Sequence, residues 1–128
     1  MLDISDEKYP KVVGMFPKAP KALLERGGGY ILGPAIHNIH ENTPGPDSFR
    51  SDDRIYAVSA VGGLRIYDVA DPYRIQEIGY YVPGTPKRFN PNGPQAGGVS
   101  REDLWVDNKR LVYLSGYNGG LEIVESTG

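Results

Sequence analysis

The residues with the clearest chemical potential lie in the segment GPAIHNIHENTPG, residues 33–45, which contains both histidines of the chain, His37 and His40, followed directly by Glu41. Neutral imidazole is the commonest protein ligand for zinc, copper and iron, and His and Glu also carry protons in catalysis. One interpretation makes His37 a ligand of a divalent transition metal, with His40 and Glu41 as candidate catalytic groups. The other is that both histidines only form hydrogen bonds within the fold.

The spacing of the two histidines limits how they could act together. Residues three apart in a regular strand point to opposite faces, so His37 and His40 could not reach one ion unless a bulge intervenes. We therefore expect His37 to approach a ligand and His40 to point away from it. Asp103, in the segment REDLWVD, has about the same place in a later strand and could add a carboxylate ligand. The alternative for Asp103 is a strand cap or a pair with Arg101.

Two long loops, residues 17–33 and 83–98, hold further candidates. The second loop carries Lys87, Arg88 and Phe89, which could close over a binding site and hold an anionic or aromatic ligand. Functional residues often lie on such loops when a rigid scaffold holds them.

The composition excludes several classes of function. Fourteen basic and sixteen acidic residues give a formal charge of -2, which provides no electrostatic reason to expect nucleic acid or an anionic membrane as a partner. The absence of cysteine excludes disulfides, zinc thiolate sites and thiol catalysis. The N-terminal segment lacks the features of a signal peptide, and no apolar run reaches membrane-spanning length. We therefore expect a soluble, cytoplasmic protein.

Turn-forming residues dominate the chain of 128 residues, which holds 17 glycines and 11 prolines beside 9 tyrosines. This composition indicates short strands separated by many turns. Only residues 20–26, PKALLER, could form a helical turn or two before three glycines end it. The predicted fold class is therefore all-β.

An internal repeat defines the predicted strands. Residues 55–69, IYAVSAVGGLRIYDV, align without gaps on residues 112–126, VYLSGYNGGLEIVES. Each copy is a strand, a double glycine that permits positive φ, and a second strand with apolar residues at alternate positions. This pattern predicts an antiparallel hairpin.

A second repeat links distant parts of the chain. Residues 2–16, LDISDEKYPKVVGMF, align on residues 67–81, YDVADPYRIQEIGYY. The aspartates at the matched positions are expected to accept backbone hydrogen bonds in turns. The full unit is thus two strands, a glycine hairpin, a third strand, an aspartate turn and a fourth strand.

Four-stranded units in series are the pattern of β-propeller blades. Within a single domain, 1–128, we predict the fourth strand of one blade in residues 1–17, one complete blade in residues 34–83 and three strands of a last blade in residues 98–128. The strands are expected near residues 11–16, 35–41, 54–60, 64–69, 74–82, 102–107, 110–116 and 120–125.

The segment GGLRIYDVADP, residues 62–72, resembles the motif of a propeller family with LVIVD repeats. LDISDEKYP at residues 2–10 is similar to the second half of that motif, and GGLEIVESTG at residues 119–128 to the first half without the aspartates. The resemblance implies a propeller fold but no particular activity. Segments similar to HNIHEN, residues 37–42, are typical of the final blades of this group, which favours a site there.

The number of blades predicts a need for partners. About two blades cannot close a ring, which takes about four to eight. The open apolar faces would act as interfaces. We therefore expect a homo-oligomer, or a larger propeller chain that supplies the missing blades. The remaining alternative is that the sequence is a fragment of a longer gene.

Three functions remain open at this point. In the first, the chain is a propeller subunit that binds a metal or small ligand at the central channel through His37, with the long loops as a lid. In the second, it is a scaffolding module without chemistry. In the third, it is a metal-dependent oxidoreductase or lyase subunit in which His40 or Glu41 carries protons.

Overall fold

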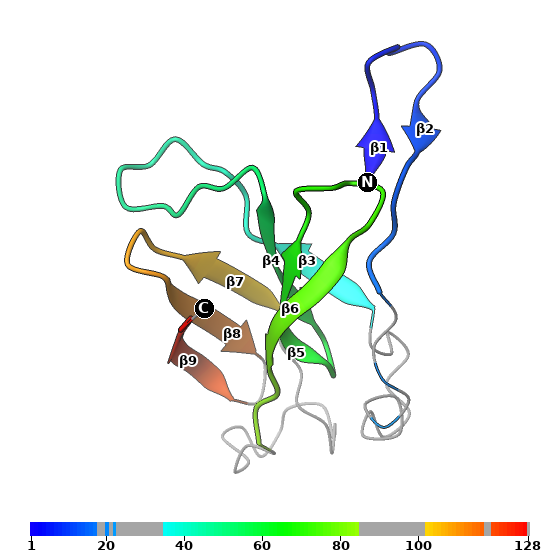
Figure 1. The fold of residues 1–128 in the computed structure, drawn as a ribbon. Helices are drawn as coiled ribbons and strands as arrows, with labels where there is room; N and C mark the ends of the chain where they lie inside the picture. The colour runs from blue at the N-terminus through cyan, green and yellow to red at the C-terminus, as the bar shows by residue number, and fades with distance from the viewer. Residues whose placement is uncertain (18–19, 21, 23–34, 85–101, 117–118, 128) are drawn as a thin grey trace.

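The computed structural model describes residues 1–17, 20, 22, 35–84, 102–116 and 119–127. In these residues nearly all of the regular structure is strand, and the strands form three antiparallel sheets (Figure 1). The predicted all-β class is therefore confirmed. The sheets of the described residues do not close into a ring. Over the same residues, the structure contains no helix with the length and apolar character needed to cross a membrane.

The strands pair in the order in which they follow one another along the chain. β1 (Leu2–Asp3) and β2 (Lys11–Val12) form a short ribbon that projects from the rest of the molecule (Figure 1). The four-stranded sheet consists of β3 (Ile36–Ile39), β4 (Arg54–Ser59), β5 (Gly63–Asp68) and β6 (Gln76–Tyr81). The three-stranded sheet consists of β7 (Asp103–Val106), β8 (Leu111–Gly116) and β9 (Gly120–Glu125).

The predicted strands of the two larger sheets are confirmed to within two residues at each end. The first predicted strand, residues 11–16, is shorter than expected because β2 ends at Val12. β1 lies where the second repeat matches the end of β5. The predicted helical turn at residues 20–26 lies almost wholly outside the described residues.

The two hairpins turn at the positions that the first repeat predicts. The second glycine of each pair, Gly63 and Gly120, has positive φ, at 70° and 67°. A side chain at such a position is strained, so glycine is required for the backbone path. The two sites differ in their surroundings: a Cβ added to Gly63 would collide with the Tyr81 carbonyl oxygen, whereas a Cβ added to Gly120 would meet no atom within 4 Å.

Aspartates also organise the repeated turns as expected. The carboxylates of Asp3 and Asp68 each accept a hydrogen bond from the backbone N–H two residues later, at 2.9 Å in both turns. Asp6 and Asp71 do the same at 3.1 and 3.0 Å. The hydrogen bond from the Ser5 N–H lowers the pKa of the exposed Asp3 carboxyl. The repeat in the sequence is thus a repeat in turn geometry.

The main core lies between the four-stranded and three-stranded sheets. Because side chains alternate along a strand, every second residue of β4, β5, β7 and β8 points into this layer. The buried residues of the layer are Tyr56, Val58, Leu64, Ile66, Leu104, Val106, Val112 and Leu114. Full burial of each aliphatic or aromatic side chain stabilises the fold by about 1.5–3 kcal/mol, so this layer holds the two sheets together.

The opposite face of the four-stranded sheet has a smaller core of its own. Ala57, Tyr67 and Val69 are buried there, and Phe16 from the N-terminal segment packs against Tyr67 with ring centroids 4.6 Å apart. Burial and the nearby Glu77 carboxylate raise the pKa of the Tyr67 phenol. The four-stranded sheet is therefore covered on both faces.

Substitution of the two positive-φ glycines should separate backbone strain from steric collision. Gly120→Ala should lower the free energy of unfolding by about 1–2 kcal/mol, because only the left-handed backbone is penalised. Gly63→Ala should cost more, because the added Cβ also forces β5 and β6 apart at Tyr81. Urea unfolding of both variants measures the difference. Equal losses would show that the contact with β6 does not constrain Gly63.

Candidate binding site between β3 and β7

The two larger sheets meet at a polar cavity between their first strands. The cavity has a volume of about 470 Å³. Its lining comes from β3 and the residues that follow it, and from β7: His37, Asn38, Ile39, His40, Glu41, Thr43, Asp103, Leu104 and Trp105. The structure thus brings His37, His40, Glu41 and Asp103 together around one space.

A β-bulge in β3 determines where the two histidines point. Ile36 pairs with Ser59 and Asn38 pairs with Val58, so His37 is an extra residue between two consecutive pairs. A bulge of this kind shifts the alternation of side chains. Both imidazole rings therefore contact the chain around β7, His37 at Glu102 and His40 at Val106. This differs from the opposite orientations expected for a regular strand.

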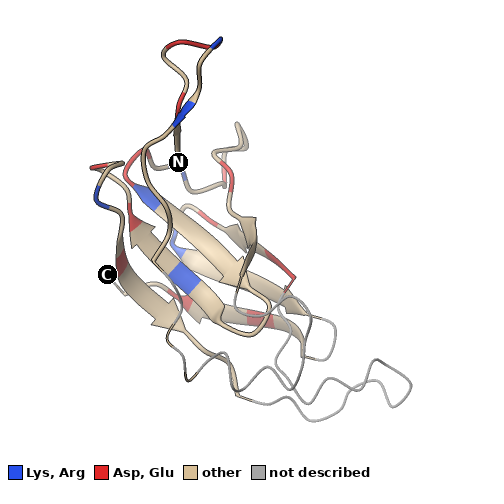
Figure 2. Cartoon of the chain, turned by 90° about the vertical axis from the view of Figure 1, so that its right-hand side faces the viewer, with Lys and Arg blue, Asp and Glu red and all other residues tan. Residues whose placement is uncertain are grey.

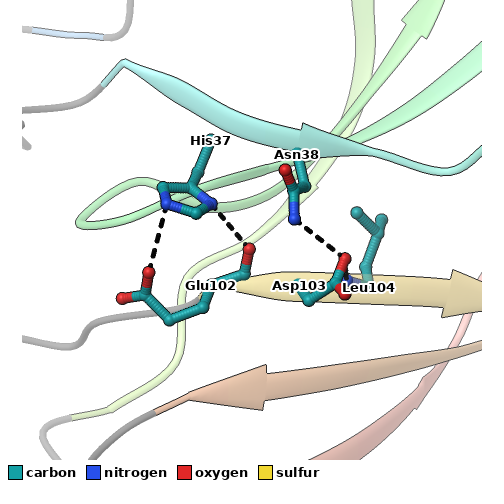
Figure 3. A network of polar contacts seen from close by, with 5 residues as sticks. All are labelled: His37, Asn38, Glu102, Asp103 and Leu104. Carbon is teal, nitrogen blue, oxygen red and sulfur yellow. Dashed lines mark hydrogen bonds and ion pairs between the residues drawn. The ribbon is translucent and has the colours of Figure 1, made fainter.

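Glu102 engages both ring nitrogens of His37 (Figure 3). Nδ1 of His37 donates to the Glu102 carbonyl oxygen at 2.8 Å, and Nε2 lies 3.3 Å from the Glu102 carboxylate. Only the doubly protonated ring can donate to both oxygens at once. The His37 side chain is 37% exposed, so this contact lies at the surface of the cavity. A metal ion at His37 would have to displace one of these contacts.

Asn38 and Asp103 form a second contact between the strands (Figure 3). The Asn38 amide donates to Oδ1 of Asp103 at 3.1 Å, and the same oxygen accepts the Leu104 N–H at 2.8 Å. Asp103 pairs with Ser115, and Asn38 pairs with Val58. The sequence repeat matches Ser115 to Val58. Asp103 is thus equivalent in register to Asn38 and lies one residue from the position expected beside His37.

His40 joins three segments of the chain. Its Nδ1 accepts a hydrogen bond from the Val106 N–H at 3.2 Å, and its Nε2 donates to the Phe49 carbonyl oxygen at 2.9 Å. These two bonds require a neutral ring with the proton on Nε2. Neither nitrogen of His40 is then open to a metal ion or a transferred proton without the loss of a hydrogen bond. The geometry assigns His40 a structural role, which agrees with the hydrogen-bonding interpretation for this residue.

The loop after β3 runs along the end of β7. The Phe49 N–H donates to the Val106 carbonyl oxygen at 3.0 Å, and the Asn108 N–H donates to the Asp47 carbonyl oxygen at 2.9 Å. Ser48 and Asp107 form an isolated antiparallel bridge between these contacts. Together with His40, these bonds fix the position of β7 beside β3.

Trp105 and Asn38 are site residues that the sequence analysis did not select. Trp105 is 39% exposed, lines the cavity and packs against Tyr113 with ring centroids 5.3 Å apart. Partial burial and the Asp107 carboxylate raise the pKa of the Tyr113 phenol. The only available signal for Trp105 was its place two residues after Asp103 in an amphipathic strand.

A metal centre is not formed by the residues that the structure describes, since they contain no group of three or more His, Cys, Asp or Glu placed to hold an ion. Glu41 is exposed at the edge of the cavity. Lys87, Arg88 and Phe89, the predicted lid residues, and Arg101, the predicted partner of Asp103, lie outside the described residues.

No protein-family model, no curated protein and no solved structure matches this chain.

Removal of the two imidazoles should have unequal effects on stability. His40→Ala leaves the Val106 N–H and the Phe49 carbonyl without their partner, which should cost about 1–3 kcal/mol of unfolding free energy. His37→Ala removes an exposed contact and should cost less than about 1 kcal/mol. Chemical unfolding at neutral pH measures both changes. A larger loss for His37→Ala would contradict the structural role of His40.

Proposed function

We propose that this chain is a subunit of a β-propeller in which the cavity between β3 and β7 forms part of a channel that binds a small cationic ligand. The observation that carries this proposal is the convergence of side chains from two first strands on one cavity: His37 and Asn38 from β3, and Asp103 and Trp105 from β7.

The proposal of blades has two supports. The four-stranded sheet pairs its strands in sequence order, and the three-stranded sheet repeats that order for its first three strands. Their hairpins share the positive-φ glycine, and the resemblance to LVIVD repeats covers the same segments. In a propeller the first strand of each blade is innermost, so β3 and β7 would line the central channel.

The chemistry of the lining favours a cation. Glu41 and Asp103 contribute carboxylates to the cavity, Glu102 lies beside it, and the indole of Trp105 offers a π face that attracts positive charge. A divalent metal ion and an organic ammonium share this charge complementarity. Because His37 already contacts Glu102, a bound metal would need further ligands from elsewhere in an assembled ring.

A scaffolding function is the second candidate, and an exposed apolar face of the three-stranded sheet favours it. Trp105, Tyr113 and Ile123 are neighbours across β7, β8 and β9, and Leu121 is exposed beside them. Exposed apolar faces commonly bind other proteins. The enzyme alternative would depend on Glu41, since His40 is committed to two hydrogen bonds.

Ligand binding can be followed through Trp105, which is the only tryptophan of the chain. We expect a saturable change in tryptophan emission when zinc, manganese or tetramethylammonium chloride is titrated into the native protein. Asp103→Asn should weaken the response about tenfold, the loss expected when a charge-assisted contact of about 1.4 kcal/mol is removed. His37→Ala should weaken the metal responses by a similar factor, because imidazole is a better ligand for metals than for ammonium.

The matched control is Glu7→Gln, which also removes one negative charge but lies in the exposed turn of the β1–β2 ribbon. It should leave the titrations unchanged. Equal weakening by Asp103→Asn and Glu7→Gln would indicate non-specific attraction. The absence of a saturable response to all three salts would contradict the proposed ligand class.

A further inference from the structure

We infer that residues 11–16 of a second copy of this chain, the complementing strand, add to the outer edge of β9 and complete the three-stranded sheet as its fourth strand. This inference rests on the proposal that the sheets are propeller blades. It names the partner, the segment and the register of the association.

The internal repeats define the register. Residues 112–126 match residues 55–69, so β9 is the counterpart of β5, and residues 2–16 match residues 67–81, so the complementing strand is the counterpart of β6. β5 and β6 pair with Leu64 opposite Tyr81, Ile66 opposite Gly79 and Asp68 opposite Gln76. Transferred through the repeats, these pairs become Leu121 with Phe16, Ile123 with Gly14 and Glu125 with Lys11. The last pair joins opposite charges, which stabilise a cross-strand contact.

The edge of β9 is available in the described part of the chain. β9 is the outermost strand of its sheet and pairs only with β8 among the described strands. Beside this edge lies a groove of about 370 Å³. It is lined by β5, β6 and the end of β9, with Leu64, Ile66, Ile78 and Val124 as its apolar walls. An added strand would cover the exposed Ile78 and the half-buried Val124, and it would satisfy the backbone groups of the edge.

The complementing strand carries the side chains that such a groove requires. In the transferred register Val12 lies opposite Val124, and Met15 lies opposite Glu122, on the face toward the groove. Val12 is 70% exposed and Met15 is 79% exposed in the single chain. Figure 2 shows many of the charged residues in the turns at the ends of the sheets.

The complementing strand cannot reach β9 of its own chain. Phe16 packs on Tyr67, on the face of the four-stranded sheet opposite the face that holds Leu64 and Ile66. The groove lies on the latter face. The four-stranded sheet thus separates the two segments, so residues 11–16 could pair with β9 only in another molecule.

β1 occupies part of the proposed position in the single chain. Leu2 pairs with Val12, and Asp3 pairs with Lys11. In the proposed arrangement Val124 and Glu125 of the second copy would take the places of Leu2 and Asp3. The N-terminal amine of Met1 also donates to the Gly14 carbonyl oxygen at 2.7 Å. The ribbon has only two residue pairs, whereas β9 offers a strand of six residues, so β9 of the second copy should displace β1.

The arrangement extends from copy to copy because the contact is head to tail. Phe16 packs on Tyr67 of its own chain, so the sheet that it completes in the other copy would lie on this face. The exposed Leu121 and Ile123 of the other copy would lie beside Phe16. Each four-stranded sheet would then lie between two completed sheets. Heterologous contacts of this type close into rings when the rotation between copies permits.

Disulfide trapping can test the register because the chain has no cysteine. Single variants Lys11→Cys and Glu125→Cys, mixed and oxidised, should form a disulfide between two chains. Lys8→Cys is the matched control: it lies in the same exposed ribbon but outside the predicted pair. Disulfides need Cβ atoms about 3.5–4.5 Å apart, so Lys11→Cys should give about tenfold more mixed disulfide than Lys8→Cys. Phe16→Cys with Leu121→Cys provides a second pair in the same register.

Two truncations add an independent measurement by sedimentation. Removal of residues 1–6 frees the complementing strand from β1 and should strengthen association, whereas removal of residues 1–17 should abolish it. Equal disulfide yields for Lys11→Cys and Lys8→Cys, or unchanged association after removal of residues 1–17, would overturn the inference. If the Trp105 titrations still saturate in that case, the proposed ligand function stands and only the strand partner is wrong. Specific trapping without a Trp105 response would instead support the strand partner and reject the ligand class.

Discussion

The packing of the three-stranded sheet on the four-stranded sheet is the contact on which the site depends. A sheet with an apolar face is stable only when another layer covers that face, and here the layer is supplied by alternate residues of β4, β5, β7 and β8. His40 adds direction to this non-directional packing, since its hydrogen bonds with Val106 and Phe49 hold the end of β3 beside β7. The cavity exists because these two strands start side by side.

The polar contacts around the cavity divide into structural and accessible groups. His40 is occupied on both nitrogens, while His37, Asn38 and Asp103 make contacts at the surface that a ligand could replace or join. The Trp105 indole adds an apolar wall to this acidic surface. We therefore propose that recognition of a cation depends on residues from both sheets, which neither sheet could provide alone.

Sequence periodicity predicted much of the fold, because the physical causes of the strands and turns are local. Alternation of apolar residues, the double glycines and the aspartate turns are visible in the sequence, and they account for the strands from β3 to β9 and for the sequential order of pairing. The shortness of β2 was not predictable, because it depends on how far β1 extends beside it.

The sequence predicted less of the candidate site than of the fold. His37 and His40 were selected as candidates, but their orientations follow from a bulge at His37 for which the sequence has no clear signal. The roles of Glu102 and Phe49 as partners depend on contacts between segments far apart in the chain, which no local pattern encodes. Trp105 both packs on Tyr113 and lines the cavity, and its place in an amphipathic strand does not distinguish these two roles.

We propose that the two stacked sheets, with an open strand edge in the described part of the chain and an exposed apolar face, form part of a larger assembly of copies. The most direct test is the molar mass of the purified native chain by sedimentation equilibrium over the micromolar range. We expect a mass that is a multiple of the 14.0 kDa chain. A single-chain mass at every concentration, in protein that is folded by circular dichroism, would contradict it.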